Sequence, residues 1–291
     1  MSEFMWRQSE MKAYIEDPRR WFLDYYCNPN PRGQAPTSEY PGTSEIGSMI
    51  HVGIEAGYAD SFPMLEIDDW VIDNVTLHEG NEAAWKEAAS KALTWALWYL
   101  DWESTEGIMV GTKILGAEHD LEIEIPGTLS SVYGTIDLLY YDQGELVVRD
   151  YKSGTQFREL NANDFQLWTY SWMASQLTGD IPGRAEYARI RQAMKSSKPM
   201  QDIVPTAITA EAMDRHGRDL IALAEEMEDV VEWLQSGGDP SELRYNTTND
   251  CGWKCNNQAA CVAMSYGEDW ESTLIYPDGS PVGINQRGST S

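Results

Sequence analysis

The sequence lacks the features that mark secreted, membrane-spanning and strongly basic proteins. Its opening, MSEFMWRQSE, is polar and charged, which is not the pattern of a secretory signal. Its longest apolar run, ALTWALWYL at 92–100, is far shorter than the ~20 residues that a bilayer-spanning helix needs. Only 21 Lys and Arg stand against 47 Asp and Glu, which gives a net charge of −26. We therefore expect a soluble, cytoplasmic protein without nonspecific affinity for nucleic acid.

The few basic residues are unevenly distributed. Arg19 and Arg20 belong to a group near the N-terminus, and Arg189, Arg191 and Lys195 belong to a second group. Because local potential, and not net charge, steers a charged ligand, a basic groove on an acidic body is compatible with this composition. A metal-binding protein and a protein from a salty interior also fit the acidic balance.

The hydrophobic pattern changes from helical to alternating and back, and no internal repeat is visible. It predicts helices over 9–26 with a break at Pro18, from Thr43 or Ser44 to 58, and over 80–104, 164–177 and 209–235. It predicts strands over 121–125, 132–141, 146–151 and 185–194. This order predicts one mixed α/β domain over 1–275, in which helices flank a short sheet and a helical insertion occupies about 56–108. The Gly-, Ser- and Pro-rich tail, 276–291, is expected to be disordered.

Two aspartates fall on the two strands expected on either side of DQGE. If the Gln-Gly dipeptide forms a two-residue turn, the register places Asp137 directly opposite Asp150. Their Cβ atoms would then lie roughly 4.5–5.5 Å apart. Lys152 shares that face, because side chains alternate with a period of two along a strand.

Two carboxylates this close repel each other unless one takes up a proton or a cation lies between them. Mg²⁺ or Mn²⁺ suits such oxygen ligands. Lys152 would then orient or deprotonate an attacking water, or neutralise charge on a phosphorane-like transition state. The alternative is that Asp150 and Lys152 are solvated residues at a strand end and that Asp137 caps a turn. This stretch alone favours neither interpretation.

Gly134, Asp137, Asp150 and Lys152 form the pattern G-x-x-D, apolar strand, D-x-K. This pattern resembles the core motif of the PD-(D/E)XK nuclease superfamily. D-x-K alone is common, so the identification depends on an ordered set of further motifs.

Further motifs resemble the RecB-like branch of that superfamily. Gln166 and Tyr170 in FQLWTY match its Q-x-x-x-Y motif, and they share one helix face at i and i+4. GSMIH matches its G-x-x-x-H helix, whose histidine is a metal ligand, and this makes His51 the candidate. Glu118 lies where relatives carry a glutamate that opens the first core strand. The resemblance covers about residues 9–265.

The resemblance implies a restriction-endonuclease-like fold and a metal-dependent DNA nuclease, most simply an exonuclease. Each residue also has an ordinary structural interpretation: a core histidine, a glutamate at a strand edge, or local packing of the glutamine and tyrosine. The implied metal ligands for Mg²⁺ or Mn²⁺ are His51, Asp137, Asp150 and the backbone carbonyl of Tyr151, with Glu118 as a further candidate. The other implied roles are water positioning by Lys152, strand binding by Gln166 and Tyr170, and a DNA path along Arg19, Arg20, Arg189, Arg191 and Lys195.

Cysteine is scarce as well, with four in the chain. Cys251, Cys255 and Cys261 lie within eleven residues, and Cys27 lies near the other end. An intracellular chain of this size needs no disulfide, and three thiols in one short segment favour a soft-metal site. The arrangement resembles the iron–sulfur staple of RecB-like nucleases, including CRISPR-associated exonucleases. There a 4Fe-4S cluster, for which four thiolates are the usual ligands, joins the two ends of the chain.

Two features depart from that family pattern. Three residues separate Cys251 from Cys255, where relatives usually have two. The position before the Pro-Arg of the N-terminal motif, which is cysteine in many relatives, is Asp17, so Cys27 would reach the cluster from ten residues further on. A structural Zn²⁺ held by four cysteines is the main alternative, and four unligated reduced thiols are the third interpretation.

The implied partners are DNA ends, together with proteins of recombination or of CRISPR adaptation, in a host or phage pathway of recombination, repair or DNA processing. A hypothesis from a different class is a catalytically silent DNA-end-binding or assembly factor that keeps the nuclease fold. A small electron-transfer protein is disfavoured, because ferredoxin-like cysteine runs are absent from the sequence.

Overall fold

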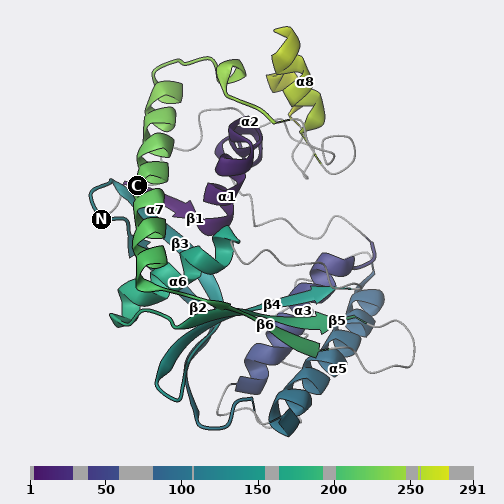
Figure 1. Ribbon diagram of the computed structural model, residues 1–291. Helices are drawn as coiled ribbons and strands as arrows, with labels where there is room; N and C mark the ends of the chain where they lie inside the picture. Colours follow the sequence, from purple (N-terminus) through teal and green to yellow (C-terminus); the bar gives the residue numbers. More distant parts are fainter. Residues whose placement is uncertain are drawn as a thin grey trace. The chain divides into compact units, whose positions relative to one another are not determined.

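The computed structural model forms two compact units, which are described separately (Figure 1). The first unit contains residues 1–34, 124–132 and 219–291, and the second contains 35–123 and 133–218. The structure describes residues 3–28, 39–58, 81–106, 108–154, 164–192, 201–246, 255 and 257–274. The predicted disordered tail at 276–291 lies outside these residues.

A mixed sheet forms the centre of the second unit. The strands follow the order β3–β4–β5–β6, and β2 also pairs with β3. The β3–β4 and β5–β6 pairs are antiparallel, whereas β4 and β5 run parallel. The strands are β2 (Thr112–Glu124), β3 (Ser130–Asp142), β4 (Glu145–Gly154), β5 (Arg184–Arg191) and β6 (Gln201–Ala207). The α/β class and the mixed sheet are confirmed, and β6 is an additional strand that the hydrophobic pattern does not predict.

The β3–β4 hairpin has the turn and register that the sequence predicts. Gln143 has φ 50° and Gly144 has φ 90°, as a two-residue turn with both central residues in the left-handed region requires. Pairing runs from the turn back to Leu138 opposite Arg149. The register prediction is confirmed over this part of the hairpin.

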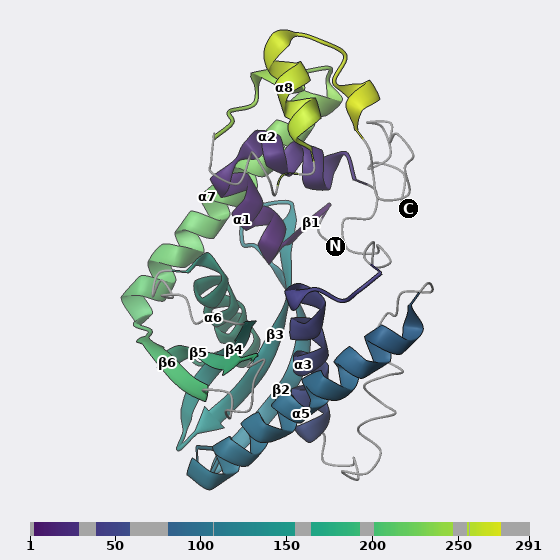
Figure 2. The ribbon, with the colours of Figure 1, turned by 90° about the vertical axis from the view of Figure 1, so that its right-hand side faces the viewer.

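Helices cover the sheet of the second unit on two sides. Residues of α3 (Thr43–Tyr58) and α5 (Glu82–Glu106) form one buried cluster with Tyr140, Val147 and Tyr151 of the sheet. Figure 2 shows α6 (Phe165–Thr178) on the opposite side of the sheet from α3 and α5. The strands β3 and β4, which carry Asp137, Asp150 and Lys152, are therefore largely buried.

The first unit brings residues from both ends of the chain together. Its described elements are β1 (Phe4–Arg7), α1 (Gln8–Glu16), α2 (Pro18–Trp21), a π-helix (Phe22–Tyr26), the second part of α7 (Ala210–Gln235), two 3-10 turns (Pro240–Glu242 and Glu271–Thr273) and α8 (Gln258–Tyr266). The predicted helix break at Pro18 is confirmed, and Asp17 caps α2 by accepting the backbone N–H of Arg20. Asn257 Nδ2 donates to Asp24 Oδ1 at 2.7 Å.

None of the helices in the described part of the chain has the length and apolarity that a membrane crossing requires.

Candidate metal centre

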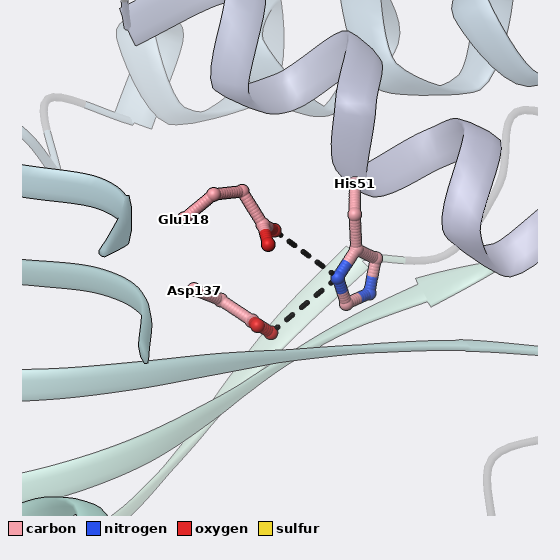
Figure 3. Close-up of side chains that lie close together, drawn as sticks. All are labelled: His51, Glu118 and Asp137. Atoms are coloured by element: carbon pink, nitrogen blue, oxygen red, sulfur yellow. Dashed lines mark ion pairs between the residues drawn. The ribbon is translucent and has the colours of Figure 1, made fainter. Parts of the chain in front are cut away.

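Three side chains from three elements of the second unit converge at one point (Figure 3). His51 lies on α3, Glu118 on β2 and Asp137 on β3. The His51 Nδ1 atom is 3.5 Å from Oε1 of Glu118 and 3.6 Å from Oδ2 of Asp137. One ligand atom from each residue lies within 4.8 Å of the other two. An imidazole and two carboxylates at this spacing are able to hold one divalent metal ion.

The position of His51 depends on a close approach between α3 and β4. A Cβ added at Gly47 would lie only 2.8 Å from Oγ of Ser153. Glycine at this position therefore lets the helix approach the end of β4, and His51 follows one turn later on the same helix. This close contact explains why the first position of the G-x-x-x-H motif is glycine.

Glu118 is held in an unusual backbone conformation. Its φ is 44°, within the left-handed region that non-glycine residues rarely adopt. Such a conformation costs on the order of 1–3 kcal/mol and is found preferentially at functional sites. The Glu118 Oε1 atom is buried and accepts no hydrogen bond from the described residues. A buried carboxylate oxygen that faces the His51 imidazole at 3.5 Å fits the donor set of a metal site.

The two aspartates are arranged differently from the simple hairpin that the sequence predicts. The described β3–β4 pairing stops at Leu138 and Arg149. Beyond it, Oδ2 of Asp137 accepts the backbone N–H of Tyr151 at 2.6 Å. The carboxylate of Asp137 thus takes the place of a backbone carbonyl in the ladder. Asp150 is 1% exposed, and its negative charge is close enough to raise the pKa of Asp137.

Lys152 and the Q-x-x-x-Y motif extend the site toward α6. The Lys152 Nζ atom lies 2.6 Å from Oδ2 of Asp150 and donates to Oε1 of Gln166 at 3.0 Å. Gln166 Nε2 in turn donates to the hydroxyl of Tyr170 at 3.4 Å. Because Gln166 and Tyr170 lie one turn apart on α6, both can join this line of contacts. The four residues form one continuous polar chain.

Gly134 of the G-x-x-D motif makes room for Tyr170. A Cβ at position 134 would lie 2.7 Å from Cε1 of Tyr170, closer than a carbon pair can approach without displacement. The glycine therefore allows the α6 tyrosine to pack directly on β3, three residues before Asp137. Through this contact, the G-x-x-D motif on β3 meets the Q-x-x-x-Y motif on α6.

Burial and neighbouring charges strongly perturb the acids and the histidine. Burial disfavours the imidazolium, but Asp137, Glu118 and Asp150 outweigh it and raise the pKa of His51 to about 9. Burial and the nearby Asp150 raise the pKa of Asp137 to about 8, although His51 opposes this shift. Because these groups interact, they titrate together, and protons held among them offset part of the negative charge in the metal-free site. A divalent cation would replace that positive charge.

The second aspartate is buried and forms an ion pair with a lysine whose side chain is partly exposed. Burial raises the pKa of Asp150, even though Lys152 and His51 act in the opposite direction. Burial disfavours the charged ammonium of Lys152, but the Asp150 carboxylate outweighs it and raises the lysine pKa. Lys152 is therefore a cation in the metal-free protein, suited to stabilising negative charge.

Comparison with known proteins identifies the family. A family model described as the PD-(D/E)XK nuclease superfamily matches residues 6–262. The chain belongs to this superfamily. The superfamily resemblance inferred from the G-x-x-D and D-x-K motifs is thus confirmed. The finer assignment to the RecB-like branch is not tested by the match.

Individual relatives are distant. The Gene 69 protein of Mycobacterium phage D29 is 33% identical to this superfamily member over 121 residues, which is 40% of this chain and 42% of the phage protein. The match therefore spans less than half of that relative. A structure described as the crystal structure of SSO0001 covers 74% of this chain and 83% of its own, at 13% identity and a TM-score of 0.27. That likeness is too low to support an argument about the fold.

The basic residues expected along the DNA path differ from one another in burial and in their partners. Arg19 is only 4% exposed, and its guanidinium donates to Oγ of Ser265 at 2.9 Å and to the carbonyl of Ser241 at 2.5 Å. It therefore fixes the C-terminal segment within the first unit. Arg20 pairs with Asp24 at 3.0 Å, Arg189 pairs with Asp202 through two nitrogens, and Arg191 is exposed. Lys195 lies outside the described residues.

Three of the four cysteines are described, and all three belong to the first unit. Cys27 is buried, whereas Cys255 and Cys261 are partly exposed. The Cys261 N–H donates to the carbonyl of Asn257 at 3.0 Å, and Asn257 is the residue bonded to Asp24. Cys251 lies outside the described residues. Among the residues that are described, the candidate metal group contains His51, Glu118 and Asp137 and none of the cysteines.

Proposed function

We propose that this chain is an Mg²⁺- or Mn²⁺-dependent deoxyribonuclease, most simply an exonuclease, that hydrolyses phosphodiester bonds. The observation that carries the proposal is the convergence of His51, Glu118 and Asp137 from three elements within 4.8 Å. Beside them, the buried Asp150 is paired with Lys152 at 2.6 Å. Acids held this close to one another, together with a lysine, suit metal-assisted attack of water on a phosphate.

The proposed ligands are His51, Asp137, Asp150 and the backbone carbonyl of Tyr151, with Glu118 as a further ligand. When bound, the metal ion supplies a Lewis acid for the phosphate oxygen and lowers the pKa of a water. The protons held among His51 and its neighbouring acids leave when these groups become ligands. The Tyr151 N–H bond orients the carboxylate of Asp137, and the carboxylate of Glu118 faces His51 at 3.5 Å.

Lys152 has the proposed role of orienting the water and stabilising the charge on the phosphate in the transition state. Its Nζ atom is held between Asp150 and Gln166, so its position is fixed before substrate binds. Gln166 and Tyr170 are proposed to hold the DNA strand from α6. Arg20, Arg189, Arg191 and Lys195 remain the proposed cations along the path of the DNA.

The biological setting is proposed from the sequence resemblance and from the phage relative. We assign the chain to the RecB-like branch because its sequence carries both a G-x-x-x-H motif ending at His51 and a Q-x-x-x-Y motif beginning at Gln166. The family match over 6–262 runs through both units, which supports one nuclease domain over 1–275. Its proposed partners are DNA ends and recombination or CRISPR-adaptation proteins, in a cytoplasmic pathway of host or phage DNA processing.

The proposal is tested with DNA labelled at one end, in single- and double-stranded form, with Mg²⁺, Mn²⁺ or EDTA. We expect loss of label only with metal, and no loss with Asp150→Asn. Label released as mononucleotides indicates an exonuclease, whereas fragments of intermediate length indicate an endonuclease. Metal-independent binding without cleavage of any substrate would contradict the proposal and favour a catalytically silent DNA-end-binding factor.

We also propose a 4Fe-4S cluster held by Cys27, Cys251, Cys255 and Cys261 in the first unit. A cavity of about 320 Å³ there is lined by Cys255 and Cys261, together with Arg20, Leu23 and Tyr266. Cys27 is buried three residues after Asp24, which is bonded to the segment between the other two thiols. These contacts fit a cluster that joins both ends of the chain.

The cluster and a structural zinc ion make different predictions. We expect a brown protein that absorbs near 400 nm and contains iron and acid-labile sulfide. A Cys261→Ser variant should lose the colour, whereas Ser272→Ala, at an exposed position of the same C-terminal segment, should keep it. A colourless protein with stoichiometric zinc would overturn the cluster in favour of a four-cysteine zinc site.

A further inference from the structure

The second unit buries a group of charged and phenolic side chains behind the metal site, centred on Arg149. The Arg149 side chain is 0% exposed and immediately precedes Asp150 in β4. Because successive residues of a strand point to opposite faces, the guanidinium and the Asp150 carboxylate lie on opposite sides of the sheet. Arg149 is therefore next to the site along the backbone without belonging to its ligand set.

The guanidinium of Arg149 contacts three other elements. Its Nε donates to Oε1 of Glu186 on β5 at 2.7 Å, and its Nη2 donates to the hydroxyl of Tyr140 on β3 at 2.8 Å. Its Nη1 donates to the hydroxyl of Tyr99 on α5 at 3.3 Å and pairs with Glu103 of the same helix. One side chain thus connects β4 to β3, β5 and α5.

The network continues from Glu103 to the helix that carries His51. Glu103 is 2% exposed and accepts from the hydroxyl of Tyr99 at 2.9 Å and from the hydroxyl of Tyr58. Tyr58 is the last residue of α3, two turns after His51. A continuous line of hydrogen bonds therefore runs from β4 to α3, the two elements that hold metal ligands on either side of the site.

Stability alone does not account for this group. Glu186 also accepts from Arg184 Nε at 3.2 Å, so two guanidinium groups face two buried carboxylates. Well-packed apolar residues of similar volume are often as stabilising as a buried ion-pair group. The ionic group instead fixes the orientation of its partners, because the five donors of a guanidinium lie in one rigid plane. Such a group fixes how β4 lies relative to its neighbours.

The need for such fixing is greatest at Arg149. The described β3–β4 pairing ends at this residue, and beyond it the carboxylate of Asp137 accepts the Tyr151 N–H. We infer that Arg149 is a positioning residue: through Glu103 it fixes the segment of β4 with Asp150 and Tyr151 relative to the helix of His51, and thereby sets the affinity of the site for its metal ion. The inference rests on the proposed metal site.

The test is a titration of the full-length protein with Mn²⁺ by calorimetry, together with thermal unfolding. Arg149→Lys keeps the charge and loses the rigid set of donors. We expect it to raise the Kd for Mn²⁺ by about tenfold or more, as loss of a residue that orients metal ligands typically does. The matched control is Arg184→Lys at the more exposed end of the same group, which should lower Tm and leave the Kd unchanged.

A second variant keeps the test decisive if Arg149→Lys does not fold. Tyr58→Phe removes only the hydroxyl that connects α3 to Glu103, and it should raise the Kd for Mn²⁺ at nearly unchanged Tm. A wild-type Kd in a folded Arg149→Lys protein, or in Tyr58→Phe if the first variant does not fold, would overturn the inference. The Kd for Mn²⁺ is measured without DNA cleavage. A chain that binds Mn²⁺ but cuts no DNA would therefore contradict the proposed activity, while the effect of Arg149 on metal affinity could still be measured.

Discussion

The carboxylate of Asp137 accepts the backbone N–H of Tyr151 at 2.6 Å. In an extended strand, the N–H and the C=O of one residue point to the same side. The carbonyl of Tyr151 therefore points toward Asp137 and away from β5. One hydrogen bond thus orients a carboxylate and leaves a neighbouring backbone carbonyl facing the same space, which supports the proposal that both are metal ligands.

Lys152 is predicted to act in the transition state. Lys152→Ala should lower kcat by about 10²–10³-fold, because it removes a cation aimed at developing negative charge. The matched control is Lys91→Ala, which breaks an exposed ion pair with Glu87 on α5 and should leave cleavage unchanged. Rates are measured on end-labelled DNA at saturating Mn²⁺. A Lys152→Ala protein that cuts at the wild-type rate would remove this residue from the reaction.

Glu118 is predicted to contribute to metal binding although its backbone is strained. Glu118→Gln should weaken Mn²⁺ binding by about tenfold, because it removes a charged oxygen that accepts no hydrogen bond from the described residues. Glu124→Gln, an exposed residue on the same strand, is the control and should bind normally. Calorimetric titration of both variants decides the matter, and equal affinities would exclude Glu118 as a ligand.

Metal affinity is predicted to rise with pH. His51 and Asp137 have pKa values of about 9 and 8 in the folded, metal-free chain, and a metal ion must displace their protons. Affinity for Mn²⁺ should therefore increase between pH 7 and 9, by up to about tenfold per pH unit for each proton released. Titrations in buffers with different ionisation enthalpies count those protons. Affinity that is constant over this range would contradict the assignment.

The same two groups predict how the metal-free protein responds to pH. Both folded pKa values lie above the ordinary values of 6.5 for His51 and 3.8 for Asp137. The stability that each group contributes is complete below its ordinary pKa and is lost as pH rises through the folded value. Tm measured in EDTA should therefore fall from pH 6 to 9, and Mn²⁺ should restore it. A Tm in EDTA that rises over this interval is the contrary result.

Gly134 and Tyr170 are predicted to be energetically coupled. Gly134→Ala places a methyl group 2.7 Å from Cε1 of Tyr170 and should destabilise the fold by about 1–3 kcal/mol. Tyr170→Ala opens that space, so the double variant should lose less stability than the sum of the two single variants. Chemical denaturation of the four proteins gives the coupling, and simple additivity would show that the contact is not rigid.

Local chemistry made the hairpin predictable. A Gln-Gly pair between two apolar segments specifies a two-residue turn, and the turn fixes the register back to Leu138 and Arg149. The same reasoning fails at the next expected pair, Asp137 and Asp150. The bond from Asp137 to the Tyr151 backbone is a side chain replacing a carbonyl, and no pattern of apolar residues encodes it.

The buried group around Arg149 could not be derived from the sequence. Its partners Tyr58, Glu103 and Glu186 lie far apart in the chain and meet only through tertiary packing. The available signal was a charge at an inward position between Val147 and Tyr151, in ELVVRDYK. Such a charge normally implies a buried partner, but the sequence does not say which residue supplies it.

The central claim is that a divalent ion lies among His51, Glu118, Asp137 and Asp150. A crystal of the protein soaked in millimolar Mn²⁺, with data collected at the manganese absorption edge, tests it most directly. We predict an anomalous peak within about 2.5 Å of at least three of these side chains. An anomalous map without a peak there, in crystals that leave the site open to solvent, would contradict the account.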